Sequence, residues 1–208
     1  MSSFFPPFES PIEPEDVDDV EVLEPVWAGQ PHDVLPGTLA LAVELGRSPT
    51  TVVRLEDVRV FPEGVVFRLA VRIRHTSMRE RTRVLGQLDV THGRGMLHLG
   101  LPQGGLRWGF EYADGQRVTT LDRSPWTQVP AEADPMDWVP AGLVMDGASQ
   151  SMHYGERWAR DVWLWPLPPP GELRVVCAWP ERDIPETSTT LDATAIRAAA
   201  ADARPLWP

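Results

Sequence analysis

Apolar and polar residues alternate along three stretches in the first half of the chain, which is the pattern of half-buried β-strands. These stretches are 38–45, 50–61 and 65–75. The third is the clearest, with apolar residues on one face and arginines on the other: Phe67, Leu69, Val71 and Ile73 against Arg68, Arg72 and Arg74. The second changes phase near Glu56–Asp57, which predicts a β-bulge or corner there.

Two later stretches predict β-hairpins. Residues 106–121 contain the turn signal Asp114-Gly115, and pairing around it places Phe110 opposite Thr119. Residues 160–179 turn at 168–171, and this pairing places Trp165 opposite Arg174. One face of the second hairpin is apolar and is expected in the core: Val162, Leu164, Leu173, Val175, Cys177 and Trp179. Pro166 cannot donate to a ladder, so the first strand is expected at a sheet edge or to end there.

The remaining segments give weaker signals, apart from one helix. Residues 76–105 fit either short strands or a glycine-rich loop, and residues 122–158 are expected to be mostly loop. Residues 193–204 are alanine-rich, follow the good N-cap residue Asp192 and precede Pro205. These three features predict a C-terminal helix.

The order of these elements predicts the fold class. Turn signals recur about every ten residues, and strands do not alternate with helices. We therefore expect an all-β fold, an immunoglobulin-like antiparallel β-sandwich with one C-terminal α-helix. The sandwich is expected over 36–191, with 192–208 packed on it. Residues 1–35 are rich in proline and acidic residues, which predicts a flexible arm.

The charge is concentrated in that arm. The formal net charge is −11, and residues 1–46 contain no lysine or arginine. The rest of the chain is close to neutral, and such a balance excludes nucleic acid as an expected partner because phosphate binding needs an excess of cations. We expect the arm to fold onto or steer toward an arginine-bearing surface such as Arg68, Arg72 and Arg74.

The sequence also bears on location. No stretch approaches the roughly 18 consecutive apolar residues of a membrane span, so no membrane partner is expected. The first residues lack the basic and apolar regions of a signal peptide. The single cysteine, Cys177, excludes an internal disulfide and favours a reducing, cytoplasmic compartment.

Two segments carry a resemblance to known sequences. The first is "LRWGFEYADGQRVTTLD", and the second is "WLWPLPPPGELRVVCAWPERDIPETSTTLDATAIRAAAADARPLWP". Together they resemble a set of uncharacterised proteins from high-GC actinobacteria, over roughly 36–208 and most densely in the last 50 residues. The resemblance implies the source and the β-sandwich-like fold, and it implies no activity.

Catalytic and cofactor chemistry finds little support in the sequence. Cys177 lies in mid-strand and is expected to be a small buried hydrophobe rather than a nucleophile. No metal is expected, because the candidate ligands lack chelating spacing: His92, His98, His153 and Glu156. No cofactor is expected either, because the glycines of 93–105 form no phosphate-binding motif.

Two groups of residues are candidate binding sites. Trp163, Trp165 and Arg174 form one, if the tryptophans are not covered by the C-terminal helix, by 205–208 or by phenylalanines of the arm. The second is the loop 149–161, with His153, Tyr154 and Glu156. The leading hypothesis is a non-enzymatic module that binds a protein partner or forms a homo-oligomer through the tryptophan face. The alternatives are a small-ligand or carbohydrate-binding sandwich and, less favoured, an enzyme centred on the loop.

Overall fold

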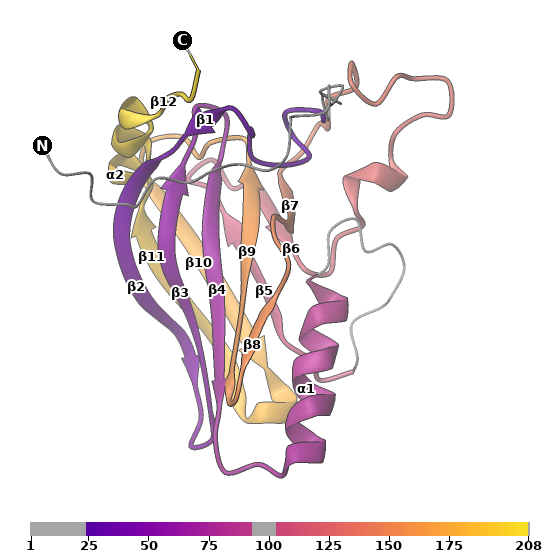
Figure 1. Cartoon of the computed structure of the whole chain (residues 1–208), viewed down its shortest axis with the longest axis vertical. Helices are drawn as coiled ribbons and strands as arrows, with labels where there is room; N and C mark the ends of the chain where they lie inside the picture. Colours follow the sequence, from indigo (N-terminus) through magenta and orange to yellow (C-terminus); the bar gives the residue numbers. More distant parts are fainter. Residues whose placement is uncertain (1–23, 93–102, 208) are drawn as a thin grey trace, which may run out of the picture.

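The computed structural model describes residues 24–92 and 103–207. Two antiparallel sheets pack face to face (Figure 1), and β1 and β12 form a third, two-stranded antiparallel sheet. One sheet has the order β2-β3-β4-β9-β7, with β8 also pairing with β9, and the other has the order β11-β10-β5-β6. The strands are β1 (Val34–Leu35), β2 (Gly37–Arg47), β3 (Thr51–Val60), β4 (Val65–Ile73), β5 (Arg107–Glu111), β6 (Arg117–Thr119), β7 (Val144–Gly147), β8 (Met152–Tyr154), β9 (Arg157–Trp165), β10 (Glu172–Trp179), β11 (Ile184–Asp192) and β12 (Arg204–Pro205). This arrangement confirms the all-β, sandwich-like class.

The first three long strands follow the alternation of the sequence. β2, β3 and β4 pair in consecutive antiparallel order. The predicted change of phase is a bulge at Asp57, which has a φ of 51°, and the register shifts there between Glu56 and Val58. The bulge keeps Leu55 and Val58 on the core side although their spacing is odd, and both are buried.

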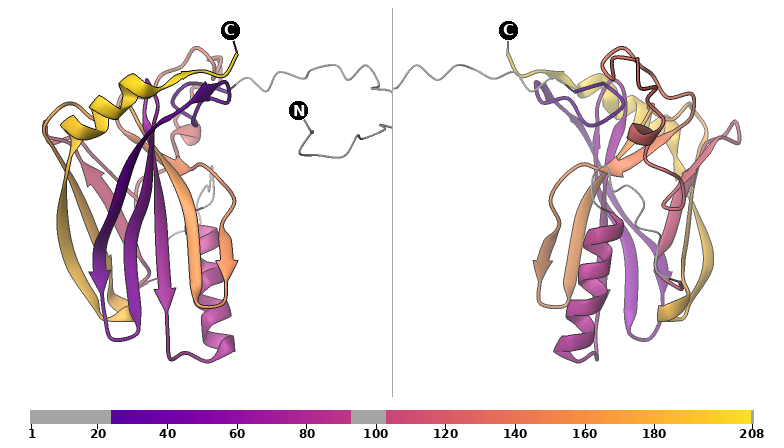
Figure 2. Two further views of the ribbon diagram at one scale, coloured as in Figure 1. Left: turned by 60° about the vertical axis from the view of Figure 1, so that its left-hand side comes forward. Right: turned by 90° about the vertical axis from the view of Figure 1, so that its right-hand side faces the viewer.

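The expectation of strand or loop for 76–105 is wrong for its first half, which forms α1 (Met78–Thr91). Ser77 caps the helix by accepting a hydrogen bond from the Glu80 amide. Val84, Leu85 and Leu88 are buried in the main core, because α1 fills the space between the sheets beside β8 and β9 (Figure 2). The C-terminal helix is therefore not the only one.

The hairpin predicted at 160–179 is also wrong, although both of its strands exist. β9 lies between β4 and the β7–β8 edge, while β10 lies between β5 and β11 in the other sheet. Residues 166–171 carry the chain from one sheet to the other. The predicted core faces are buried as expected, because they pack against each other across the sandwich instead of lying side by side in one sheet.

The hairpin at 106–121 is present as β5 and β6, with a register one residue from the prediction. Phe110 pairs with Val118, not with Thr119. The turn holds three residues, 113–115, and not two. Gly115 takes a φ of 85°, the left-handed conformation that closes such a three-residue turn.

The C-terminal helix confirms its predicted start. In α2 (Ala193–Ala199) the Asp192 carboxylate accepts hydrogen bonds from the Thr194 and Ala195 amides. The α-helix ends at Ala199 and continues as a short 3-10 turn, so it is shorter than predicted. It packs on β2 at Gly37, where a Cβ atom would lie 1.7 Å from the Ala199 carbonyl oxygen.

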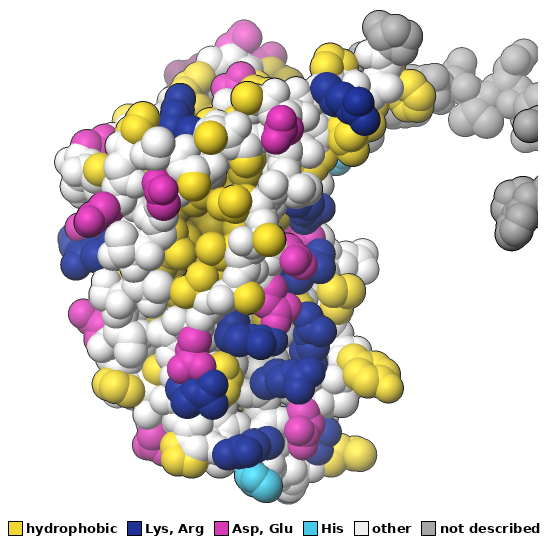
Figure 3. All heavy atoms as spheres, turned by 90° about the vertical axis from the view of Figure 1, so that its left-hand side faces the viewer, with side chains coloured by type: hydrophobic (Ala, Val, Ile, Leu, Met, Phe, Trp, Pro, Cys, Tyr) yellow, Lys and Arg dark blue, Asp and Glu magenta, His cyan; other side chains and the backbone are white. Residues whose placement is uncertain are grey.

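The two sheets come together along β2 and β11. The Thr187 hydroxyl donates to the Leu45 carbonyl, and the Thr189 hydroxyl donates to the Glu44 carbonyl at 3.4 Å. Figure 3 views this side of the molecule and shows apolar side chains gathered in the middle of it. On the opposite side, β6 and β7 are the last strands of their sheets, so the sandwich stays open there.

Within residues 24–35, which the sequence assigns to a flexible arm, Trp27 and Ala28 are buried against the six-stranded sheet, and Val34–Leu35 pair with β12. Trp27 is 2% exposed, and its indole Nε1 donates to the Trp138 carbonyl at 2.7 Å. Residues 1–23 lie outside the described part of the chain. No helix among the described residues is long and apolar enough to cross a membrane.

Candidate functional site

A cleft of about 1140 Å³ opens between β6 and β7, at the open side of the sandwich. Because it lies between the edges of the two sheets, its walls come from segments that are far apart in sequence. Its apolar lining includes Val90, Val118, Leu121, Leu143, Met145 and Val162. Leu121 is 62% exposed and Val90 is 42% exposed, so part of this apolar surface is open to a ligand.

Three arginines line the same cleft: Arg107, Arg117 and Arg123. All three are exposed, and none of their side chains has an ion pair or hydrogen bond with another residue in the described part of the chain. Asp122 lies beside them and accepts hydrogen bonds from the Thr119 amide and hydroxyl. Arg107 and Arg117 alternate with the buried Trp108 and Val118, so their side chains point outward at the rim of the cleft. The cleft therefore combines apolar walls with exposed guanidinium groups at its rim, which can bind an anion, and with the carboxylates of Asp122 and Asp146.

His92 lies at the inner end of the cleft and is 5% exposed. The Trp108 indole Nε1 donates to its Nε2 at 2.9 Å, so the ring proton is on Nδ1, which lies 2.9 Å from the Leu88 carbonyl. Both ring nitrogens are thus engaged. The ring also packs edge-on against Trp158, with centroids 5.3 Å apart. His92 therefore supports the cleft floor and is not available as a base.

Burial makes the stability of the fold pH-dependent through His92. Desolvation lowers its pKa from 6.5 to about 4. A histidine whose pKa falls on folding contributes stability fully above pH 6.5, and this stability is lost as the pH falls toward about 4. The full effect is about 3 kcal/mol, of which about 2 kcal/mol is expected to be lost by about pH 5.

We expect His92→Gln to reduce the loss of unfolding free energy between pH 7.5 and pH 5, measured by urea denaturation at each pH. His32→Gln is the matched control, because the His32 side chain is 69% exposed. An unchanged pH dependence in His92→Gln would show that His92 is not the group that titrates.

The residues of the predicted loop site, His153, Tyr154 and Glu156, do not come together in one site. His153 Nε2 donates to the Asp89 carboxylate of α1 at 2.9 Å, and the Trp158 indole donates to the same carboxylate oxygen at 2.7 Å. Burial alone would raise the pKa of Asp89, but hydrogen bonds from Ser151, Trp158 and His153 outweigh it, and the pKa is lowered. Tyr154 follows His153 in β8, so its side chain points to the opposite face and is 88% exposed. Glu156 is also exposed and no hydrogen bond or ion pair of its side chain to a described residue brings it to His153.

The predicted pairing of Trp165 with Arg174 is wrong, because the two residues lie in different sheets. Arg174 forms an ion pair with Glu111 at 2.5 Å. Trp163 is 0% exposed, and its indole donates to the Trp27 carbonyl at 3.1 Å. The segment around Trp27 therefore covers Trp163. The sequence predicted other covers for the tryptophans: the C-terminal helix, residues 205–208 or phenylalanines of the arm. The apolar "VWA" at 26–28, set among prolines and acids, is the signal that could have indicated it.

Trp165 is only partly buried and packs with the small cluster around Trp27 and Val144. Cys177 is 1% exposed, and burial raises the pKa of its thiol to about 12, so it has no thiolate at neutral pH. Within residues 24–92 and 103–207, no three His, Cys, Asp or Glu side chains are placed to hold a metal ion. His98 lies outside these ranges.

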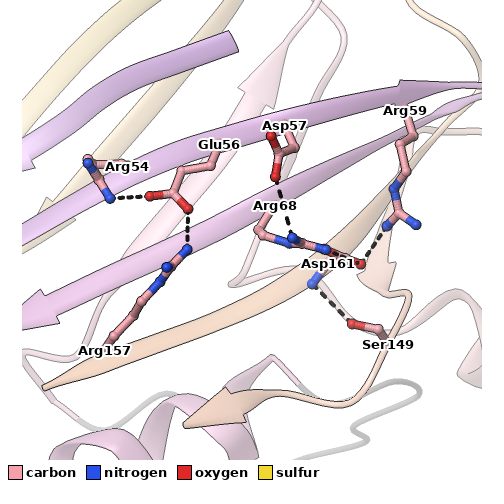
Figure 4. Close-up of polar contacts among 8 residues, drawn as sticks. All are labelled: Arg54, Glu56, Asp57, Arg59, Arg68, Ser149, Arg157 and Asp161. Carbon is pink, nitrogen blue, oxygen red and sulfur yellow. Dashed lines mark hydrogen bonds and ion pairs between the residues drawn. The ribbon is translucent and has the colours of Figure 1, made fainter. Parts of the chain in front are cut away.

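The outer face of the six-stranded sheet carries a network of ion pairs (Figure 4). Glu56 is shared by Arg54 and by Arg157, whose guanidinium lies 2.6 Å away. Asp161 is shared by Arg59 at 2.5 Å and Arg68 at 2.8 Å. Each carboxylate therefore neutralises only one of two guanidiniums. We call Arg54, Arg59, Arg68, Arg72 and Arg157 the arginine face.

Comparison of the chain with models of protein families, with curated proteins and with solved structures finds no match. The function must therefore be inferred from the cleft and the surfaces themselves.

Proposed function

We propose that this protein binds a small organic anion in the cleft between β6 and β7. The observation that carries the proposal is the combination of apolar walls with three exposed arginines at the rim, whose side chains have no partner among the described residues. The cleft is large enough for a molecule with an apolar body and one or two acidic groups. The sequence analysis offered small-ligand binding at the tryptophans as an alternative. Here the ligand is expected in the cleft instead.

Binding is favoured over catalysis by the state of the reactive groups near the cleft. Both ring nitrogens of His92 are engaged in hydrogen bonds. Asp122 accepts two hydrogen bonds from Thr119. Cys177 lies in the core with a raised pKa. None of these groups is poised as a nucleophile or general base.

The test is a fluorescence titration of the full chain with anilinonaphthalene sulfonate, an aromatic anion, and with the uncharged N-phenylnaphthylamine. We expect the anion to bind more tightly, and Arg117→Gln to weaken it several-fold, since a charge-assisted contact contributes about 1.5–3 kcal/mol when desolvated and less at an exposed rim. Leu121→Ser is expected to weaken both probes.

Arg79→Gln is the control, because Arg79 is an exposed arginine of α1 that does not line the cleft. Equal affinity for the charged and uncharged probes, or equal effects of Arg79→Gln and Arg117→Gln, would contradict the proposal.

Protein interaction, including self-association, is a second candidate, and one observation favours it at a different surface from the predicted one. β8 is a three-residue edge strand that exposes Met152 and Tyr154, at 55% and 88%. Exposed aromatic and methionine side chains are typical of interfaces. Light scattering coupled to size exclusion is expected to reveal an oligomer that Tyr154→Ser dissociates; a monomeric wild type would remove this candidate.

Two finer assignments remain predictions. The immunoglobulin-like class is one of them, and the consecutive order β2-β3-β4 in a single sheet differs from the A-B-E-D order of immunoglobulin domains. Cytoplasmic location is the other, and it is supported by the single, buried cysteine.

A further inference from the structure

The solvent-facing charge of the arginine face is positive although the face contains ion pairs. The Glu56 and Asp161 side chains are only 15% and 9% exposed. The arginines that share them, Arg54, Arg59, Arg68 and Arg157, are 37%, 33%, 27% and 40% exposed. The Glu56 and Asp161 carboxylates therefore lie beneath the guanidiniums. Two exposed carboxylates belong to the same face: Asp57, which is 68% exposed, and Glu44, which lies opposite Arg54, is 41% exposed and forms an ion pair with Arg47. The described arginines of this face still outnumber its carboxylates.

The lower end of this face is the most cationic. Arg72 of β4 lies directly opposite Arg157 of β9, and the Arg72 side chain has no ion pair or hydrogen bond with a described residue. Like charges placed opposite each other in a sheet repel, so this pair favours an added anion. The next row holds Ala70 and Ala159, which are only 2% and 1% exposed, so the arginine side chains around them form the surface. Figure 3 shows dark-blue arginine side chains gathered on the side of the molecule that this sheet forms.

The N-terminal segment reaches the same face. Trp27 contacts Trp163, which lies on the outer side of β9 together with Asp161 and Arg157. The six residue steps from Trp163 to Arg157 span about 20 Å of strand. The preceding residues 1–23 span up to about 75 Å when extended, which is ample to follow the face.

We propose that the acidic segment 9–23 docks on the arginine face of its own chain. The segment carries Glu9, Glu13, Glu15, Asp16, Asp18, Asp19 and Glu21 and has no lysine or arginine. Opposite charge gives the attraction, and a tether of this length keeps the segment at millimolar effective concentration, so a weak contact is populated. The contact places the negative charge of the chain over its main cationic surface and leaves the cleft open.

The experiment is paramagnetic broadening of amide NMR signals in the full chain, with a nitroxide attached to Ser10→Cys. Cys177 is buried with a raised thiol pKa and does not take up the label. We expect signals around Arg54, Arg72 and Arg157 to be lost, and those of β10 and β11 to be retained. Raising the salt from about 0.1 M to 1 M shortens the Debye length from about 10 Å to 3 Å and is expected to restore the signals.

Two variants and one mixture make the result decisive. Arg72→Gln is expected to reduce the broadening, whereas Arg79→Gln on α1 is expected to leave it unchanged. Broadening at Arg107 and Arg117 of the cleft instead, or none on the arginine face, overturns the proposal. So does broadening in a mixture of isotope-labelled chains with spin-labelled, unlabelled chains, because the contact would then lie between chains.

Discussion

Replacement of Trp163 by alanine is expected to lower the free energy of unfolding by about 3–5 kcal/mol, the range for deletion of a large buried aromatic side chain. Trp163 is 0% exposed and packs edge-on against Phe61, with ring centroids 5.8 Å apart. The variant leaves a cavity between the sheet and the segment around Trp27, and it leaves the Trp27 carbonyl without its indole donor. Urea denaturation of the full chain measures the loss.

The control for this prediction is Trp207→Ala, which removes the same side chain from a position that is 74% exposed and is expected to change stability little. A stably folded Trp163→Ala protein that dissociates from an oligomer would support the tryptophan interface predicted from sequence and would contradict internal packing.

Asp161→Asn is expected to destabilise the fold by about 2–3 kcal/mol, less than the 3–5 kcal/mol for a fully buried ion pair because Arg59 and Arg68 remain about one-third exposed. The Asp161 side chain is 9% exposed, and its charge holds these two guanidiniums together. The amide keeps the shape but removes the negative charge, so two cations are left side by side.

Asp57→Asn is the matched control. Asp57 contacts Arg68 at 3.4 Å but is 68% exposed, and an exposed pair contributes about 0–1 kcal/mol. Equal losses in thermal or urea denaturation for the two variants would show that Asp161 is not the electrostatic centre of the face.

The alternation of residues predicted the first sheet well because each of β2, β3 and β4 buries one face. The bulge at Asp57 was visible as a change of phase. The same alternation misplaced β9 and β10, because apolar faces that meet across a sandwich have the same pattern as one face of a hairpin. Only the pairing partners, β4 and β5, distinguish the two arrangements, and these are far away in sequence.

The sequence pattern did not predict the helix α1 or the cleft, for a different reason. α1 buries only Val84, Leu85 and Leu88 and contains Gly86, so its helical period is weak and its stability comes from the space that it fills between the sheets. The cleft depends on which strands end the sheets. β7 lies in a region predicted to be loop, so neither the cleft nor its arginines were among the predicted sites.

Binding in the cleft is tested most directly by NMR titration of the full chain with anilinonaphthalene sulfonate. We expect the chemical shift changes to concentrate on β6 and the adjoining residues 119–123, and on residues 143–145 across the cleft. Changes confined to Met152 and Tyr154 of β8, or spread over the arginine face, would contradict a ligand site between β6 and β7.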